Sequence, residues 1–270
     1  MSLFKNSSFF AISLLIFFFG TFLIYFFEWG GNSYYPLTGV LYLVASFLPV
    51  LATFAVFSLF GFSGTRSRSI IFIALGFFAF FIGEVIFFFY NIVLETDPFP
   101  SVADIYYLLA YPFFLVGYVK ELTQSQISWN LKRSFLVALF VLILGGLVSY
   151  FGIYLAYDVE AGFWINFVSM AYGIGDVILV VVLLHILFLT MEYRGGKVFR
   201  PWLFIFLGNM AILVADILFA IYYEEYTSHV NYYKLMDSFW IAGYLMVAYG
   251  FFDMAILLKS FRHRIQETQI

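Results

Sequence analysis

Six acidic side chains lie inside long apolar stretches of this sequence. They are Glu84, Asp104, Asp176, Asp216, Asp237 and Asp253. If these stretches cross a membrane, each acidic residue at mid-depth costs about 2.5–3.5 kcal/mol on insertion scales. No Lys or Arg lies within the same stretches to neutralise them. We therefore expect each carboxyl group to be protonated, to accept hydrogen bonds from Tyr, Trp or Ser, to face water, or to bind a cation.

Four of these acidic residues belong to two matching patterns, separated by about half the chain. The spacing acid-x-x-aromatic-x-x-x-Tyr occurs as Asp104, Tyr107 and Tyr111, and again 133 positions later as Asp237, Trp240 and Tyr244. The preceding stretches match at an offset of 132, with Gly76, Glu84, Phe87 and Tyr90 corresponding to Gly208, Asp216, Phe219 and Tyr222. Internal duplication is common in membrane proteins. We predict two parallel four-helix repeats, 1–134 and 135–270, integrated in one membrane domain.

The two patterns predict a ligand- or cation-binding pocket. Positions i, i+3 and i+7 share a helix face, and Glu84 and Asp216 lie at similar heights in their stretches. The pocket is expected between the third, fourth, seventh and eighth stretches, and a metal ligand set is left open. Its residues are Glu84, Asp104, Tyr107, Tyr111, Asp216, Asp237, Trp240 and Tyr244. The alternative is that Asp104 and Asp237 cap helix starts and that the aromatic residues only pack, rather than surround a ligand or cation.

A second candidate is the string Gly173-Ile174-Gly175-Asp176 in the sixth stretch. It resembles the G-x-G-D string of intramembrane aspartyl proteases, which implies two carboxyl groups that share a proton and activate water. A protease would therefore place Asp176 within hydrogen-bond reach of another carboxyl group. The chain has no Pro-Ala-Leu segment, which those proteases carry. His185, nine residues further on, is a secondary polar candidate or a packing residue.

Composition excludes several classes of protein. Of 270 residues, 64% are hydrophobic, 24% aromatic and 11% charged, and the mean hydropathy is +0.99. Soluble domains have about 45–50% apolar and about 25% charged residues, so a soluble or disordered protein is excluded. A net charge of −3 gives no basic surface for nucleic acid. With no Cys and three His, the sequence predicts no cofactor: disulfides, iron–sulfur clusters and a bis-His haem are all excluded.

The apolar stretches predict an all-α, polytopic bundle of eight transmembrane helices. A span needs about 20 apolar residues. The stretches cover residues 9–27, 38–60, 70–94, 102–119, 135–156, 163–190, 202–223 and 235–258.

Basic residues predict the orientation in the membrane. Twelve of the thirteen Lys and Arg residues lie at one set of ends, and only Lys234 lies at the other. Because cytoplasmic loops carry the excess of Lys and Arg, both termini are expected in the cytoplasm, with the chain integral to the cell membrane. The opposite ends are acidic, and the pocket is expected to face outward.

The segment from Asp97 to Pro112 reads D-P-F-P-S-V-A-D-I-Y-Y-L-L-A-Y-P. It resembles a signature in the multi-span N-terminal regions of microbial signalling proteins. Those regions precede diguanylate cyclase (GGDEF), cyclic-di-GMP phosphodiesterase (EAL) or histidine kinase domains. The resemblance implies a membrane sensory domain that binds a ligand. Only residues 259–270 follow the last stretch, so we expect no attached output domain and action through a membrane or cytoplasmic signalling partner.

Four functions remain open from the sequence. A sensor predicts a site open only to the outside. A proton- or cation-coupled transporter predicts a second opening, with Asp176 and His185 along the route. A structural subunit of a membrane complex predicts spans that serve only as packing surface. The protease is the fourth, so an enzyme is not the favoured interpretation. The oligomeric state and the identity of the ligand are left open.

Overall fold

The computed structural model describes residues 7–29, 34–62, 64–124, 131–155, 157–160, 162–191, 198–227 and 236–268. Within these residues the chain is helical, with no strand. The helices are α1 (Ser7–Phe27), α2 (Tyr34–Phe60), α3 (Thr65–Phe88), α4 (Val102–Thr123), α5 (Leu131–Leu147), α6 (Phe163–Thr190), α7 (Phe199–Ile221), α8 (Tyr223–Thr227) and α9 (Asp237–Thr268). All except α8 are long and apolar enough to cross a membrane. The predicted all-α bundle of eight long apolar helices is confirmed.

Two helices end in π-helical turns. The turn η3 (Phe89–Val93) continues α3, and η4 (Val148–Tyr154) continues α5. Segments of this kind are often found at functional sites. Here η3 leads into the connection that carries the Asp97 to Ser101 part of the signature.

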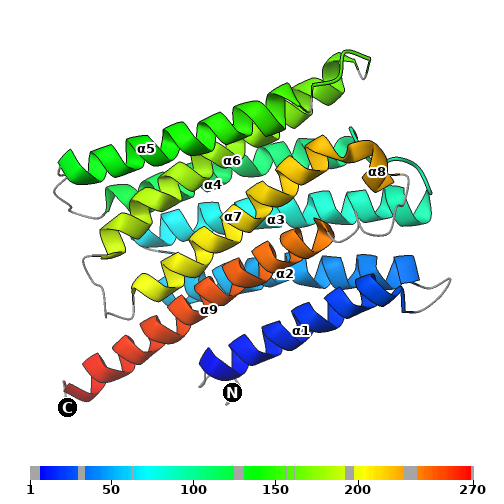
Figure 1. The fold of residues 1–270 in the computed structure, drawn as a ribbon. Coiled ribbons are helices and arrows are strands. Elements are labelled where there is room, and N and C mark those ends of the chain that lie inside the picture. The colour runs from blue at the N-terminus through cyan, green and yellow to red at the C-terminus, as the bar shows by residue number, and fades with distance from the viewer. Residues whose placement is uncertain are drawn as a thin grey trace.

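The helices form one bundle with two of them at its edges (Figure 1). In the interior α3 packs on α4, α7 packs on α9, α2 packs on α3 and α9, and α6 packs on α4 and α7. The main core draws side chains from these six helices, with Phe77, Phe114 and Phe251 among its buried members. Helix α1 covers α9 and α2, while α5 lies along α6 on the opposite edge. The six interior helices are therefore the ones that can position a buried site.

Two glycines bring helix pairs together in matching ways. A Cβ on Gly117 of α4 would lie 2.9 Å from the carbonyl oxygen of Ser69 in α3. A Cβ on Gly250 of α9 would lie 2.6 Å from the carbonyl oxygen of Pro201 in α7. Only glycine allows this close backbone approach without a shift. The two contacts are related by the same offsets as the sequence patterns, so the packing is consistent with the predicted repeat, which stays a prediction.

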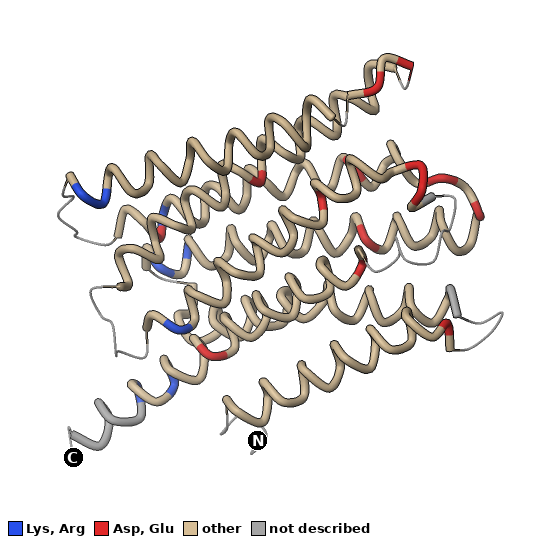
Figure 2. The backbone as a smooth tube through the Cα atoms, in the orientation of Figure 1, with Lys and Arg blue, Asp and Glu red and all other residues tan. Residues whose placement is uncertain are grey.

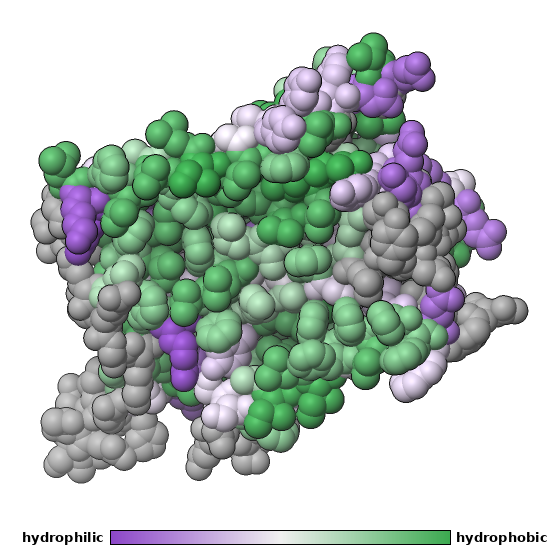
Figure 3. Space-filling model, in the orientation of Figure 1, coloured by the Kyte–Doolittle hydropathy of each residue, from purple (hydrophilic) through white to green (hydrophobic). Residues whose placement is uncertain are grey.

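The outer surface of the bundle is apolar between its two ends. Figure 3 shows hydrophobic side chains over the central surface and hydrophilic ones at the two ends. Ile16 and Phe19 of α1 and Leu142 and Ile143 of α5 are all more than half exposed. In water, a surface of this kind would be an interaction site or an aggregation hazard. Contact with lipid tails explains it for helices of this length.

Charged residues are segregated along the bundle. Figure 2 shows the described Lys and Arg residues at the end where both termini lie, and most Asp and Glu residues toward the opposite end. Four of the basic residues that predict the orientation lie outside the described residues: Lys5, Arg194, Lys197 and Lys234. We refer below to the basic end and the acidic end of the bundle.

One expectation about the buried carboxyl groups is wrong. Asp253, only 4% exposed, has a cationic partner. Arg200 Nε donates to Asp253 Oδ2 at 2.9 Å, and Ser7 Oγ donates to Oδ1 at 2.9 Å. The reason is that α7 begins at Phe199, three residues before the predicted apolar stretch, so Arg200 lies inside the helix beside α9. The carboxylate of Asp253 in α9 thus contacts both Arg200 of α7 and Ser7 at the start of α1, and it joins the three helices at the basic end.

Candidate functional site

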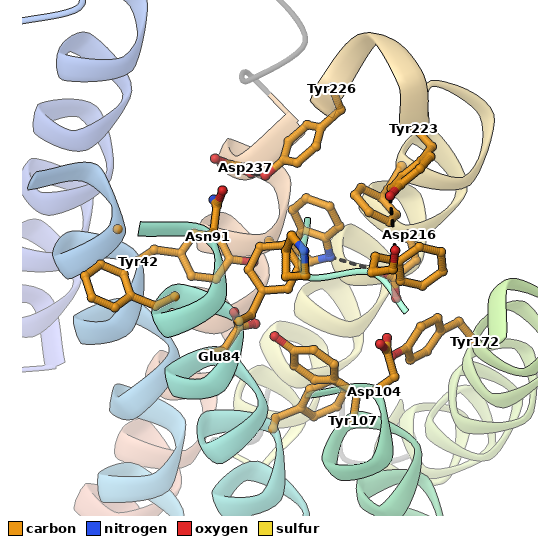
Figure 4. A pocket seen from close by; sticks show the side chains of 18 of the residues that line it. Tyr42, Glu84, Asn91, Asp104, Tyr107, Tyr172, Asp216, Tyr223, Tyr226 and Asp237 are labelled. Atoms are coloured by element: carbon orange, nitrogen blue, oxygen red, sulfur yellow. Dashed lines mark hydrogen bonds between the residues drawn. The ribbon is translucent and has the colours of Figure 1, made fainter. Parts of the chain in front are cut away.

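A cavity of about 670 Å³ lies among the helices toward the acidic end. Residues from α1, α2, α3, η3, α4, α6, α7, α8 and α9 line it, together with the connection from Glu95 to Phe99. Figure 4 shows polar and aromatic side chains from these elements around the space. Its volume lies within the about 300–1,000 Å³ that small-molecule sites occupy. The cavity is therefore large enough for an organic ligand rather than only an ion.

The structure brings seven of the eight predicted pocket residues to this cavity. They are Glu84, Asp104, Tyr107, Asp216, Asp237, Trp240 and Tyr244. Tyr111 is buried but does not line the cavity, and neither do Asp176 and His185. The arrangement places the predicted residues together, and whether they bind a ligand stays a prediction.

Glu84, in the half of α3 toward the acidic end, lies beside two phenols. Tyr244 of α9 donates to its Oε1 at 2.6 Å, and Tyr107 of α4 faces the same carboxyl group. Tyr42 of α2 lies beside Tyr244, with the ring centroids 5.9 Å apart. Glu84 is 7% exposed. One carboxyl group thus links four helices around the cavity.

Asp216 of α7 occupies the position that corresponds to Glu84 in the second sequence pattern. Trp240 of α9 donates its indole N–H to Oδ1 of Asp216 at 2.7 Å. The corresponding residue in the first pattern, Tyr107, faces Glu84. The paired positions of the two patterns are therefore neighbours in both cases.

Asp176 lies behind Asp216, on α6, away from the cavity lining. Tyr111 of α4 donates to Oδ1 of Asp176 at 2.7 Å, which explains why Tyr111 points away from the cavity. Oδ2 of Asp176 is buried and has no donor in the described part of the chain. The Asp176 carboxyl group lies next to that of Asp216. The G-x-G-D resemblance implied that Asp176 lies near a second carboxyl group, and it does. Asp176 is only 4% exposed.

Asp104 serves both as a helix cap and as part of the cavity wall. Ser101 is the N-cap of α4, and its backbone N–H donates to Asp104 Oδ2 at 2.6 Å, while Ala103 N–H donates to Ser101 Oγ at 3.1 Å. This is a capping box with Asp in the place of the usual Glu or Gln. The hydroxyl group of Tyr172 on α6 donates to the other carboxyl oxygen, Oδ1, at 2.5 Å. The two alternatives that the sequence left open for Asp104 thus occur together.

Asp237 is the first residue of α9 and is 8% exposed. Tyr226 of α8 donates to its Oδ1 at 2.8 Å. Tyr25 of α1 is also hydrogen-bonded to this carboxyl group. Asp237 therefore connects the outermost helix and the short helix α8 to the cavity.

A tyrosine in α8 holds the connection that follows η3. The hydroxyl group of Tyr223 donates to the carboxylate of Asp97 and lies 3.2 Å from the carbonyl oxygen of Phe99. Burial and the bond to Asp97 raise the pKa of Tyr223 above its ordinary value. Tyr223, Asp97 and Phe99 all line the cavity, so this contact forms part of its wall at the acidic end.

The cavity wall is acidic and aromatic. Of the residues that the structure describes, the lining includes six acids and no Lys, Arg or His. The acids are Glu84, Glu95, Asp97, Asp104, Asp216 and Asp237. In the part of the chain that the structure describes, no three His, Asp or Glu residues lie close enough together to hold a metal ion. The carboxyl groups are thus spread around the wall, each with its own donors, rather than gathered into one metal centre.

Sequence reasoning missed several tyrosines of this site. Tyr25, Tyr42 and Tyr172 come from α1, α2 and α6, which were not expected to contribute. A signal existed for Tyr172, since it lies four residues before Asp176 and so on the same helix face. The apolar stretches around Tyr25 and Tyr42 hold no acidic residue that would mark a polar face. His185 lies elsewhere on α6, where its Nδ1 is 2.6 Å from the carbonyl oxygen of Val181.

No family model matches the chain, and the comparisons with curated proteins and with solved structures returned no match. The function must therefore be argued from the cavity and its residues.

Proposed function

We propose that this protein is an integral membrane, sensor-like module that binds a small organic cation in the cavity at its acidic end. The observation that carries the proposal is the cavity wall: among the residues that the structure describes, six acidic side chains and no basic one line it, together with Tyr, Trp and Phe. An ammonium group is attracted by carboxylates and by the faces of aromatic rings. A ligand of this class fits both features.

The proposed site is placed to affect the rest of the bundle. The phenols beside Glu84 come from α9 and α4, and those beside Asp237 come from α1 and α8. A cation that binds these carboxyl groups competes with those phenols and so favours one packing of the helices over another. With both termini in the cytoplasm and the cavity facing outward, the change would reach a cytoplasmic or membrane partner. The resemblance of the segment from Asp97 to Pro112 to sensory membrane regions agrees with this role.

The test is thermal unfolding of the purified protein in detergent with two ammonium ions, choline and butylammonium. Each is paired with an uncharged isostere in which carbon replaces the charged nitrogen. A ligand at a hundred times its Kd stabilises the folded state by about 2.7 kcal/mol, so the ammonium ions should raise Tm and the isosteres should not. Glu84→Gln and Asp216→Asn should lose the shift. Asp253→Asn, a buried carboxyl group at the basic end, should keep it.

Equal shifts from ammonium ions and isosteres, or no shift from either, would contradict the proposal. Scans with sodium, magnesium and calcium belong in the same experiment. A metal-dependent shift that Asp104→Asn and Asp237→Asn both abolish would point to an inorganic cation instead.

A proton-coupled transporter is the second candidate, and the observation that favours it is the contact between Asp176 and Asp216. This contact extends the polar chain from the cavity wall toward the middle of α6. A transporter would move protons across liposomes when the cation is added on one side, whereas a sensor would bind the cation without proton flux.

A further inference from the structure

Two carboxyl groups meet behind the cavity wall, and no cation of the described chain lies between them. Asp176 of α6 lies next to Asp216 of α7. Each carboxyl group has one donor of its own, Tyr111 O–H for Asp176 and Trp240 N–H for Asp216. Oδ2 of Asp176 is buried and has no N–H or O–H donor among the described residues.

An ionised carboxyl group can only accept hydrogen bonds. Neither Asp176 nor Asp216 can therefore donate to the other unless one of them carries a proton. Two ionised carboxylates in contact would repel each other strongly in a medium of low dielectric constant. One shared proton removes the repulsion and supplies the missing donor.

Among the described residues, no other group around the pair takes the role of that proton. The titratable groups that face it are Tyr111 of α4, Tyr172 of α6, Glu84 of α3 and Tyr244 of α9. None of these is a cation, and the three phenols already donate to other oxygens: Tyr111 to Asp176 Oδ1, Tyr172 to Asp104 and Tyr244 to Glu84.

We propose that Asp176 and Asp216 form a proton-binding site that holds one proton between them. Asp216 lines the cavity and Asp176 does not, so the site joins the cavity to the interior of the bundle. Loss of the proton makes the cavity wall more negative by one charge. A cation that binds beside Asp216 therefore favours release of the proton, a consequence that rests on the proposed function.

The proton is observable without any ligand. The measurement is an infrared spectrum of the full-length protein in detergent. The side-chain carboxyl carbons of aspartate carry an isotope label, so that the absorption bands of Asp are separated from the band of Glu84. At about pH 7, where an ordinary Asp is ionised, we expect a carbonyl band from protonated Asp. In Asp176→Asn the new amide donates to Asp216 in place of the proton, and the band should lose the intensity of one residue.

Asp253→Asn is the matched control. Asp253 and Asp176 are both 4% exposed, but Asp253 is paired with Arg200. Its removal should leave the protonated band unchanged. If Asp176→Asn does not fold, Asp216→Asn replaces it and should show the same loss, because its amide can donate to Asp176.

A wild-type protein without the band, or a band of equal intensity in Asp176→Asn, overturns the proton site. Choline or butylammonium should weaken the band when it binds, and binding that leaves the band unchanged overturns the link to the ligand. A band present in a protein that binds neither ammonium ion refutes the proposed function and leaves the proton site standing. Ammonium binding to a protein without the band refutes the proton site and leaves the proposed function standing.

Discussion

The buried carboxyl groups around the cavity are held by phenol and indole groups. Tyr244 donates to Glu84, Trp240 donates to Asp216, and Tyr226 donates to Asp237. A hydrogen bond to a charged group contributes about 1.5–3 kcal/mol, and a buried group left without a partner is costly. Neutral donors of this kind stabilise a carboxyl group without adding a positive charge, as the proposed binding of a cation requires.

Asp104 allows the capping role to be separated from the cavity role. Asp104→Ala removes the acceptor of both the Ser101 N–H and the Tyr172 hydroxyl group, and we expect it to lower the free energy of unfolding by about 1–2 kcal/mol. Tyr172→Phe removes only the bond at the cavity and should cost less. Reversible unfolding in mixed detergent measures both. If the two variants lose the same stability, the capping box contributes nothing and this interpretation fails.

The helix pairs α3–α4 and α7–α9 are the elements that set the cavity walls. Both pairs approach closely at a glycine, and both place an aromatic residue of the second helix against an acidic residue of the first: Tyr107 with Glu84, and Trp240 with Asp216. Because interior helices are closely packed, a small change in either pair alters the distance between an acid and its donor. The pairs are therefore the elements through which occupancy of the cavity can change the bundle.

The close approach of these pairs predicts the effect of adding one methyl group. Gly117→Ala and Gly250→Ala place a Cβ within 2.9 Å and 2.6 Å of a backbone carbonyl oxygen, which cannot rotate away. Overpacking of this kind costs about 1–3 kcal/mol. Gly145→Ala in α5 is the control, since nothing lies within 4 Å of its Cβ. Thermal melts should show a lower Tm for the first two variants and an unchanged or higher Tm for the third. A stable Gly250→Ala would contradict the described α7–α9 contact.

For the whole molecule, the separation of charge between the two ends is the property that bears on function. The basic end holds both termini and the Arg200–Asp253 ion pair, and the acidic end holds the cavity. The positive-inside rule relates the basic end to the cytoplasm. A cavity at the other end would then receive its ligand from outside the cell.

The chain contains no cysteine, so single introduced cysteines can test this orientation. Glu160→Cys at the acidic end should react with a membrane-impermeant maleimide in intact cells. Lys132→Cys at the basic end should react only after the cells are permeabilised. The two sites lie at opposite ends of α5 and η4, which makes each the control for the other. The reverse labelling pattern would place the cavity on the cytoplasmic side.

The sequence by itself determined the eight long helices, because the stretches of apolar residues are long enough that no other structure satisfies their backbone groups in a membrane. It also determined which residues share a face, because 3.6 residues per turn sets this within one helix. For this reason Asp104 and Tyr107 face the cavity together from α4, and Asp237, Trp240 and Tyr244 face it together from α9. The capping role of Asp104 was likewise readable from its local position.

Only the tertiary structure decided which helix faces are neighbours. Helical periodicity says nothing about the partner across an interface, so the sequence did not place Tyr42 beside Tyr244, Tyr111 against Asp176, or Arg200 beside Asp253. These contacts join residues that lie 53 to 202 positions apart and depend on how six helices pack at once. For the same physical reason the contact between Asp176 and Asp216, and the proton that it requires, became visible only once α6 and α7 were seen side by side.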